Sequence, residues 1–202
     1  TVNYRLNLYG FLYLRFLSEA FDTNNGLYDQ ICALRFVHEN IAAFGGDPEN
    51  VTVFGQSAGG ASILALMTMP ETQGLFQKSI VQSSCTEHFF PEKDARKDTL
   101  RYLKYAGIDR AHPEDLLKLS PEQVNKVNAR YGMRRFLKGD IRCAFSPVID
   151  GTTLKEEPKI AVMKSSVKML IGNNENELAM GKTGRIRSEE RRVGKECRSR
   201  WS

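Results

Sequence analysis

The chain has 202 residues, which is long enough to bury a substantial core, so the first expectation is one domain. Its formal charge is +5, and no stretch approaches the roughly 18 apolar residues of a membrane-spanning helix. The four cysteines have no metal-binding spacing and, with Cys197 in the C-terminal tail, form no disulfide framework. We therefore expect no metal and no cofactor, and we expect the other three cysteines to be buried free thiols (Cys32, Cys85 and Cys143).

The N-terminal quarter leads from an extended segment into a helix. Residues 2–6 are expected to be extended, and the apolar residues 10–14 are expected to pack under a core. After a turn-rich loop at 22–26, residues 27–44 have apolar side chains three and four positions apart, which predicts an amphipathic helix. That helix is expected to end at Gly45.

The central motif is the stretch 51–60, with the sequence VTVFGQSAGG. Residues 51–54 predict a short buried strand, and residues 58–66 predict a helix. Between them lies the G-x-S-x-G pattern of a nucleophile elbow, in which a serine occupies a sharp turn from strand to helix. The pattern makes Ser57 the candidate nucleophile. We expect a Cβ at either Gly55 or Gly59 to crowd the neighbouring element.

The rest of the chain alternates between strand and helix patterns, as expected for an α/β fold with a doubly wound parallel sheet. The expected elements are a strand at 77–83, a charged helical insertion at 94–119, an apolar segment at 145–149, a short helix at 158–163 and a strand at 167–171 that ends at Gly172. The charges of the insertion favour a solvated surface over a binding site.

A nucleophilic serine needs a base, and the base needs an acid to orient it. Parallel sheets place such groups at the carboxyl ends of their strands, so Glu177, a few residues beyond the last expected strand, is the candidate acid. Glu175 is the rival acid, and a solvated loop carboxylate is the alternative interpretation. The backbone N–H of Ala58 is the expected donor to an oxyanion, because it opens a helix.

The base is not apparent in the sequence. All three histidines precede the candidate acid: His38, His88 and His112. In hydrolases with a nucleophile elbow, the chain order is serine, acid, histidine. We expect the catalytic histidine to lie beyond residue 186 and to be missing, so the 202-residue chain is expected to be inactive by itself.

Several segments resemble the type-B carboxylesterase and cholinesterase family over roughly residues 1–179. They are NYRL at 3–6, GLYDQ at 26–30, ENIAAFGGDP at 39–48, NVTVFGQSAGG at 50–60, GLFQKSIVQS at 74–83 and PVIDG at 147–151. The resemblance implies the α/β-hydrolase fold, here incomplete because its first strands and its C-terminal part with the histidine are missing. It also implies a triad whose acid is glutamate.

The resemblance assigns further residues at the site. Glu177 matches the glutamate of the family's G-x-x-x-D-E-G segment, although Asn176 and Leu178 replace its aspartate and second glycine. It also implies that Ser83 supports the acid and that the acyl pocket includes Ile141 and Cys143; core packing is the alternative for all three. Many family members have glutamate beside the nucleophile, so Gln56 favours neutral over cationic esters.

The C-terminal sixteen residues, 187–202, differ in character from the rest of the chain. They have no apolar periodicity, and without them Lys plus Arg falls from 29 to 23, Asp plus Glu from 24 to 21 and the charge from +5 to +2. Their sequence resembles the translation of a sequencing adapter. We therefore expect a partial carboxylesterase domain at 1–186 and a non-native tail at 187–202, and we discount binding of nucleic acid through this tail.

The function expected from the sequence is a serine carboxylic ester hydrolase that acts on small neutral esters through an acyl-enzyme. The alternative is a catalytically dead, cholinesterase-like adhesion or scaffold domain. The serine and acid are both retained, which favours the enzyme. The sequence does not specify the ester, the compartment or the oligomeric state.

Overall fold

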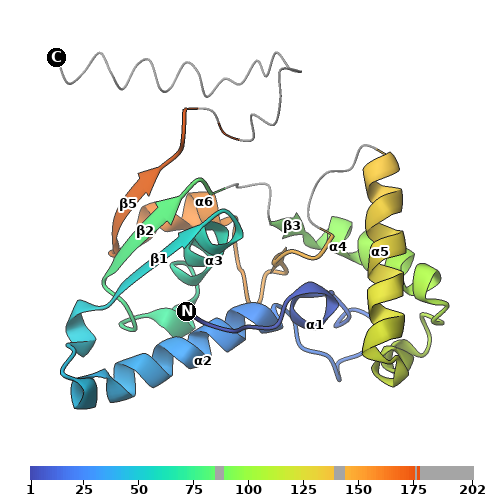
Figure 1. Cartoon of the computed structure of the whole chain (residues 1–202), viewed down its shortest axis with the longest axis horizontal. Coiled ribbons are helices and arrows are strands. Elements are labelled where there is room, and N and C mark those ends of the chain that lie inside the picture. Colours follow the sequence, from blue (N-terminus) through green and yellow to red (C-terminus); the bar gives the residue numbers. More distant parts are fainter. Residues whose placement is uncertain (85–88, 139–143, 176, 178–202) are drawn as a thin grey trace.

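A three-stranded parallel sheet forms one side of the molecule, as the computed structural model shows for residues 1–84, 89–138, 144–175 and 177. Its strands are β1 (Thr52–Gln56), β2 (Lys78–Gln82) and β5 (Lys168–Gly172), in the order β1-β2-β5. The register aligns Gln56 with Gln82 and Gln82 with Gly172, so all three strands end at the same edge. We call this edge, toward which the arrowheads point in Figure 1, the carboxyl edge.

The helix between β1 and β2 is the centre of the core. This helix, α3 (Ala58–Leu66), has the predicted bounds, and its residues from Gly60 onward are all buried. A helix that is apolar on every side is stable only when it is surrounded, and here β1, β2, α2 (Asn25–Asn40) and α6 (Pro158–Ala161) pack against it. The predicted helix at 27–44 corresponds to α2 followed by the 3₁₀ helix η1 (Ile41–Phe44).

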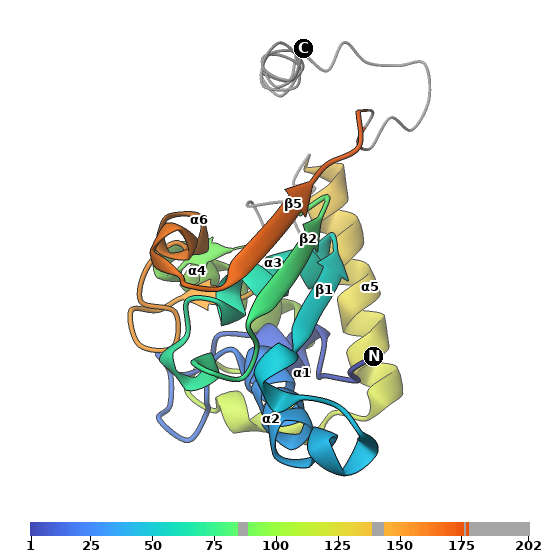
Figure 2. The same ribbon diagram turned by 90° about the vertical axis from the view of Figure 1, so that its left-hand side faces the viewer.

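The opposite face of the sheet is bare among the described residues, as Figure 2 shows. One registered row consists of Phe54, Ile80 and Leu170, and the exposed fractions of Phe54 and Leu170 are 76% and 66%. The prediction of a strand at 51–54 is therefore confirmed in position, but the prediction that it is buried is wrong. Val53 and Gly55 lie on the face of β1 that packs against α3, while Phe54, between them, lies on the other face and has no described neighbour to cover it.

The second half of the molecule, called the helical half, consists of α4 (Glu92–Ala106), the 3₁₀ helix η5 (Pro113–Lys118) and α5 (Pro121–Leu137). In the sequence it is flanked by two short strands that pair with each other, β3 (Phe90–Pro91) and β4 (Val148–Ile149). The helical half has its own apolar cluster of buried side chains, to which the N-terminal segment contributes: Leu12, Leu14, Tyr102, Leu103, Leu116 and Tyr131.

The N-terminal segment joins the two halves. After α1 (Asn7–Phe11), residues 12–14 are buried as predicted, whereas residues 2–6 form no strand. The hydroxyl of Tyr13 donates to Glu92 Oε1 at 2.7 Å, and the carbonyl of Tyr13 accepts a bond from the Thr99 hydroxyl at 2.9 Å.

The remaining short elements are connections: η2 (Pro48–Asn50), η3 (Pro70–Thr72) and η6 (Val162–Lys164). Cys32 is exposed on α2, so its predicted burial is wrong; it lies beside the stripe formed by the buried Leu27 and Ile31. Cys85 and Cys143 lie outside the described residues. No helix in the described part of the chain is long and apolar enough to cross a membrane.

Candidate active site at the carboxyl edge

Ser57 is the single residue between β1 and α3, and its backbone is strained. Its φ of 53° and ψ of −117° lie outside the regions that side-chain-bearing residues favour, which costs on the order of 1–3 kcal/mol. Neighbouring backbone holds this conformation: the Ser57 N–H donates to the Gln82 carbonyl and the Ser57 carbonyl accepts from the Ala61 N–H, both at 3.0 Å. The side chain is thereby fixed at the carboxyl edge of the sheet.

Glycines allow β1 and α3 to approach this closely. A Cβ on Gly55 would lie 2.7 Å and 2.8 Å from the carbonyl carbon and oxygen of Gly59, which are backbone atoms that cannot move aside. A Cβ on Gly60 would lie 3.0 Å from the Cβ of Ser84. A Cβ on Gly59 would meet no described atom within 4 Å. The crowding predicted at Gly59 is therefore wrong; Gly59 supplies the backbone against which Gly55 packs, and the second tight position is Gly60.

The first turn of α3 faces the same edge. Ala58 is its first residue and is exposed, and the Ser57 side chain makes no capping hydrogen bond to the helix. The opening N–H groups of a helix have no acceptor within the helix and lie at the positive end of its dipole. The arrangement therefore offers backbone donors beside a serine hydroxyl that does not cap the helix.

Ser83 occupies the corresponding position at the end of β2. It also has a positive φ, of 46°, and its N–H donates to the Gly172 carbonyl at 2.8 Å. Its hydroxyl is hydrogen-bonded to the carboxylate of Glu177, which also accepts from the Asn174 N–H at 2.7 Å. These two donors hold the pKa of the Glu177 carboxyl below its usual range, the Ser83 hydroxyl contributing most.

The sheet order thus brings three predicted residues to neighbouring strand ends: Ser57 after β1, Ser83 after β2 and Glu177 beyond β5. Gln56, the last residue of β1, lies at the same edge and is exposed. Ile141, Cys143, Asn176 and Leu178 lie outside the described residues. Sequence reasoning missed Gly60 and the Asn174 N–H; the second glycine of SAGG was the available signal for the first.

Neither described histidine lies at the carboxyl edge. His38 is in the last turn of α2, which runs beside the amino ends of the strands (Figure 1). His112 is in the helical half, where its Nδ1 lies 3.2 Å from Glu114. His88 is outside the described residues. Within the described ranges, no group of three or more His, Cys, Asp or Glu side chains could hold a metal ion.

A serine in a strained strand-to-helix turn, with a carboxylate beyond another parallel strand of the same sheet, is the arrangement found in α/β hydrolases. The chain belongs to the carboxylesterase family, whose model matches residues 1–196.

Individual relatives agree with this assignment. Para-nitrobenzyl esterase of Bacillus subtilis (strain 168) is 43% identical over 181 residues, which are 88% of this chain and 36% of that protein. Neuroligin-2 of Rattus norvegicus is 37% identical over 186 residues, which are 88% of this chain and 21% of that protein. A solved thermophilic PNB esterase superposes with a TM-score of 0.81 at 36% identity, over 95% of this chain and 40% of that chain. The chain therefore has the fold of these esterases while spanning well under half of their length.

Proposed function

We propose that the chain carries the nucleophile and the acid of a serine carboxylic ester hydrolase that acts through an acyl-enzyme. The observation that supports this proposal most is the backbone of Ser57, strained at φ 53° and fixed between the Gln82 carbonyl and the first turn of α3. Backbone strain persists where the surrounding structure over-determines it, and it concentrates at functional sites. Here it leaves the hydroxyl free of any capping role.

In the proposed reaction the Ser57 oxygen attacks the ester carbonyl as a histidine removes its proton. The negative charge on the carbonyl oxygen is stabilised by the Ala58 N–H, one donor of a kind worth about 3 to 4 kcal/mol in the transition state. The alcohol leaves with the proton, and water then releases the acid from the acylated Ser57 by the same steps in reverse.

We assign the orienting acid to Glu177 and not to Glu175. Glu177 is fixed by the Ser83 hydroxyl and the Asn174 N–H at the ends of β2 and β5, and its lowered pKa keeps it ionised at neutral pH. An ionised, fixed carboxylate is the group that holds a histidine in the productive tautomer. Glu175 is exposed.

The base belongs, in this proposal, to the longer polypeptide that carries this segment, because neither described histidine is near the edge. The 202-residue chain alone should hydrolyse esters at no appreciable rate. Residues 187–202 are proposed to be a non-native tail outside the domain of residues 1–186. Resequencing the source transcript tests this boundary, and a genomic exon encoding the tail would contradict it.

Neutral esters are the proposed substrates, since Gln56 offers hydrogen bonds without a negative charge. Ile141 and Cys143 are proposed to border the acyl group. The test compares a neutral ester with its choline counterpart in the longer polypeptide, with Gln56→Glu as the second arm. Faster hydrolysis of the neutral ester, and a gain for the choline ester in Gln56→Glu, are expected; a choline preference in the unaltered protein would contradict the assignment.

A non-catalytic adhesion or scaffold domain is the second candidate, favoured by the match to neuroligin-2, a relative not named as an esterase. Ser57→Ala separates the two candidates. It should abolish hydrolysis if the protein is an enzyme, whereas hydrolysis should be undetectable both before and after the substitution if the domain is a scaffold.

A further inference from the structure

The helical half has a seam between α4 and α5 that the proposed ester chemistry does not use. Asp98 contacts Arg135, and the Tyr102 hydroxyl donates to Asn128 Oδ1 at 2.8 Å, so the two helices run antiparallel. The seam lies on the side of the molecule away from the sheet (Figure 1).

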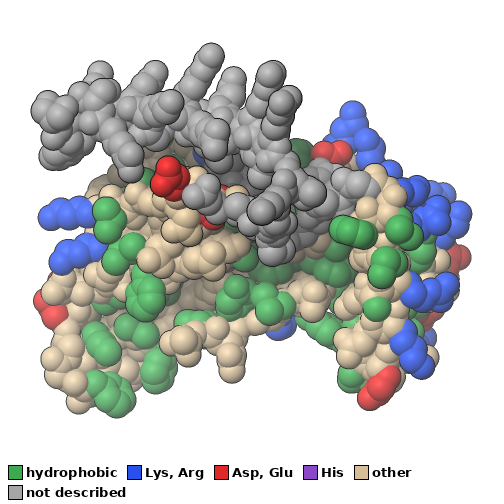
Figure 3. All heavy atoms as spheres, turned by 45° about the horizontal axis from the view of Figure 1, so that its top comes forward, with side chains coloured by type: hydrophobic (Ala, Val, Ile, Leu, Met, Phe, Trp, Pro, Cys, Tyr) green, Lys and Arg blue, Asp and Glu red, His purple; other side chains and the backbone are tan. Residues whose placement is uncertain are grey.

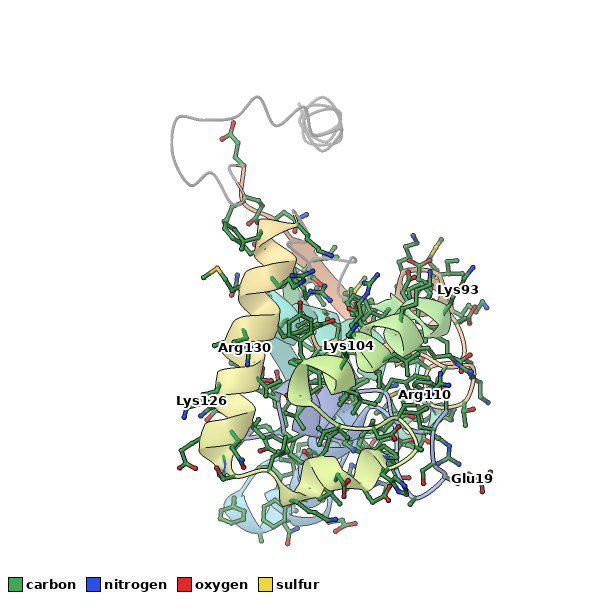
Figure 4. The ribbon with its side chains drawn as sticks, turned by 90° about the vertical axis from the view of Figure 1, so that its right-hand side faces the viewer. Glu19, Lys93, Lys104, Arg110, Lys126 and Arg130 are labelled. Atoms are coloured by element: carbon green, nitrogen blue, oxygen red, sulfur yellow. The ribbon has the colours of Figure 1, made fainter. Side chains whose placement is uncertain are left out.

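Positive charge is concentrated along this seam. Residues 99–108 hold two cations and no carboxylate, and residues 123–138 hold five cations and no carboxylate: Arg101, Lys104, Lys126, Arg130, Arg134, Arg135 and Lys138. Except for the buried Arg135, they are exposed. The carboxylate nearest in the packing, Asp98, is already bound by Arg135 and by Arg101 at 3.3 Å. Figure 4 shows Lys104 on α4 and Arg130 on α5.

An open groove of about 480 Å³ lies in the seam, lined by Tyr105, Ala129, Arg130, Met133, Arg134 and Leu137. The Arg134 guanidinium lies over the Tyr105 ring, 5.8 Å from its centroid. The exposed fractions of Met133 and Leu137 are 60% and 76%. Figure 3 shows hydrophobic side chains beside Lys and Arg on α5. The groove therefore combines two guanidinium groups with exposed apolar side chains.

We propose that this groove binds a single-chain anionic amphiphile, with its carboxylate on Arg130 and Arg134 and its alkyl chain over Met133 and Leu137. Planar guanidinium groups match a carboxylate's two oxygens, and the exposed side chains of Met133 and Leu137 offer apolar contact to a chain. The size of the groove is in the range of small-molecule sites, which favours a single ligand over an extended polyanion such as nucleic acid.

The proposal commits to a free carboxylate in solution, for which octanoate is the probe. Calorimetric titration of the 202-residue chain should show binding of octanoate. Acetate, which lacks the alkyl chain, and octan-1-ol, which lacks the carboxylate, should each bind more weakly by at least about tenfold. Equal affinity for octan-1-ol and octanoate would overturn the proposal. The Ser57→Ala variant should bind octanoate equally well, which separates this site from the proposed ester hydrolysis.

The variants address the groove directly. Arg130→Gln with Arg134→Gln should weaken octanoate binding by about tenfold or more, whereas Lys93→Gln with Arg110→Gln, which removes two exposed cations outside the groove, should leave it unchanged. Leu137→Ser changes an exposed side chain and should also weaken octanoate binding. It therefore tests the groove if the double variant fails to fold. Unchanged affinity in the folded variants would contradict the site. Binding to phosphatidylglycerol vesicles without binding to octanoate would assign the cations to a lipid surface and overturn the proposal.

Discussion

The hydroxyl of Ser83 is hydrogen-bonded to the carboxylate of Glu177 and so connects the ends of β2 and β5 at the carboxyl edge. The same Ser83 donates its N–H to Gly172, the last residue of β5. The acid is thus attached to the strand that lies between it and Ser57. Its position therefore depends on the conformation of Ser83, which has a positive φ.

Ser83→Ala should raise the pKa of Glu177 toward the usual glutamate range, because the carboxylate loses the donor that stabilises its charged form most. The lowered pKa in the folded state contributes stability above the pKa of the unfolded chain, and this contribution is lost as the pH falls through the folded value. NMR titration of the Glu177 carboxyl carbon measures the change. Ser84→Ala is the matched control, since no described residue bonds to its buried hydroxyl. An unchanged pKa in Ser83→Ala would show that the bond is absent in solution.

Gly55→Ala should destabilise the chain by about 1–3 kcal/mol, because its Cβ would overlap the Gly59 backbone. Gly59→Ala is the matched control: its Cβ meets no described atom within 4 Å, and alanine is favoured over glycine within a helix by about 1 kcal/mol. Urea unfolding measures both variants. Equal losses would refute the close approach of β1 to α3.

Asp98→Ala should cost about 1.5–3 kcal/mol of unfolding free energy, since it removes a buried carboxylate that bonds the Arg135 guanidinium between α4 and α5. Arg101→Gln removes the exposed ion pair between Arg101 and Asp98 and should cost less than about 1 kcal/mol. Urea unfolding at neutral pH compares the two. Similar small losses in both would mean that the ion pair does not hold α4 against α5.

Tyr13 should make stability fall at alkaline pH. Burial, followed by its bond to Glu92, raises the pKa of its phenol to about 12. A pKa raised in the folded state gives stability that is complete below about pH 10, the unfolded value, and is lost as the pH rises through the folded value.

Tyr13→Phe should therefore lose about 1 kcal/mol at neutral pH, from the missing hydrogen bond, and should show a shallower decline between about pH 10 and 12. Tyr9→Phe, at an exposed tyrosine, should behave like the unaltered chain. Urea unfolding at several pH values measures the decline. An equally steep decline in Tyr13→Phe would contradict this account.

Most helices and strands of the half that contains the sheet could be predicted, because their local hydrophobic patterns agree with how these elements pack. The bounds of α3 were predicted correctly, since apolar residues on every side of a helix after a strand require burial. The burial of Phe54 and of Cys32 was predicted wrongly, because residue type alone does not report which faces receive a covering layer. The crowding predicted at Gly59 was wrong for a similar reason, since only the three-dimensional structure shows where its Cβ would point.

The helical half was harder to predict. Helix α5 had no counterpart among the expected elements, because its buried residues Val124 and Tyr131 are interleaved with cations. Its start was nevertheless encoded: the Ser120 hydroxyl accepts from the Gln123 N–H, and the Gln123 side chain accepts from the Ser120 N–H, which is a capping box. The positions of Ser57 and Glu177 at the carboxyl edge could be predicted from the motif and the strand order, and the contact between Ser83 and Glu177 was implied by the family resemblance. No local pattern specifies the positive φ of Ser83, which accompanies that contact.

The central claim is that Ser57 is acylated during ester hydrolysis. The most direct measurement is acid quenching of the longer polypeptide during turnover of 4-nitrophenyl acetate, followed by mass spectrometry of its peptides. The account predicts an acetyl group on Ser57 and, in Ser57→Ala, neither acetylation nor hydrolysis. Hydrolysis that continues in a folded Ser57→Ala variant, or acetylation of a different residue in the unaltered protein, would contradict it.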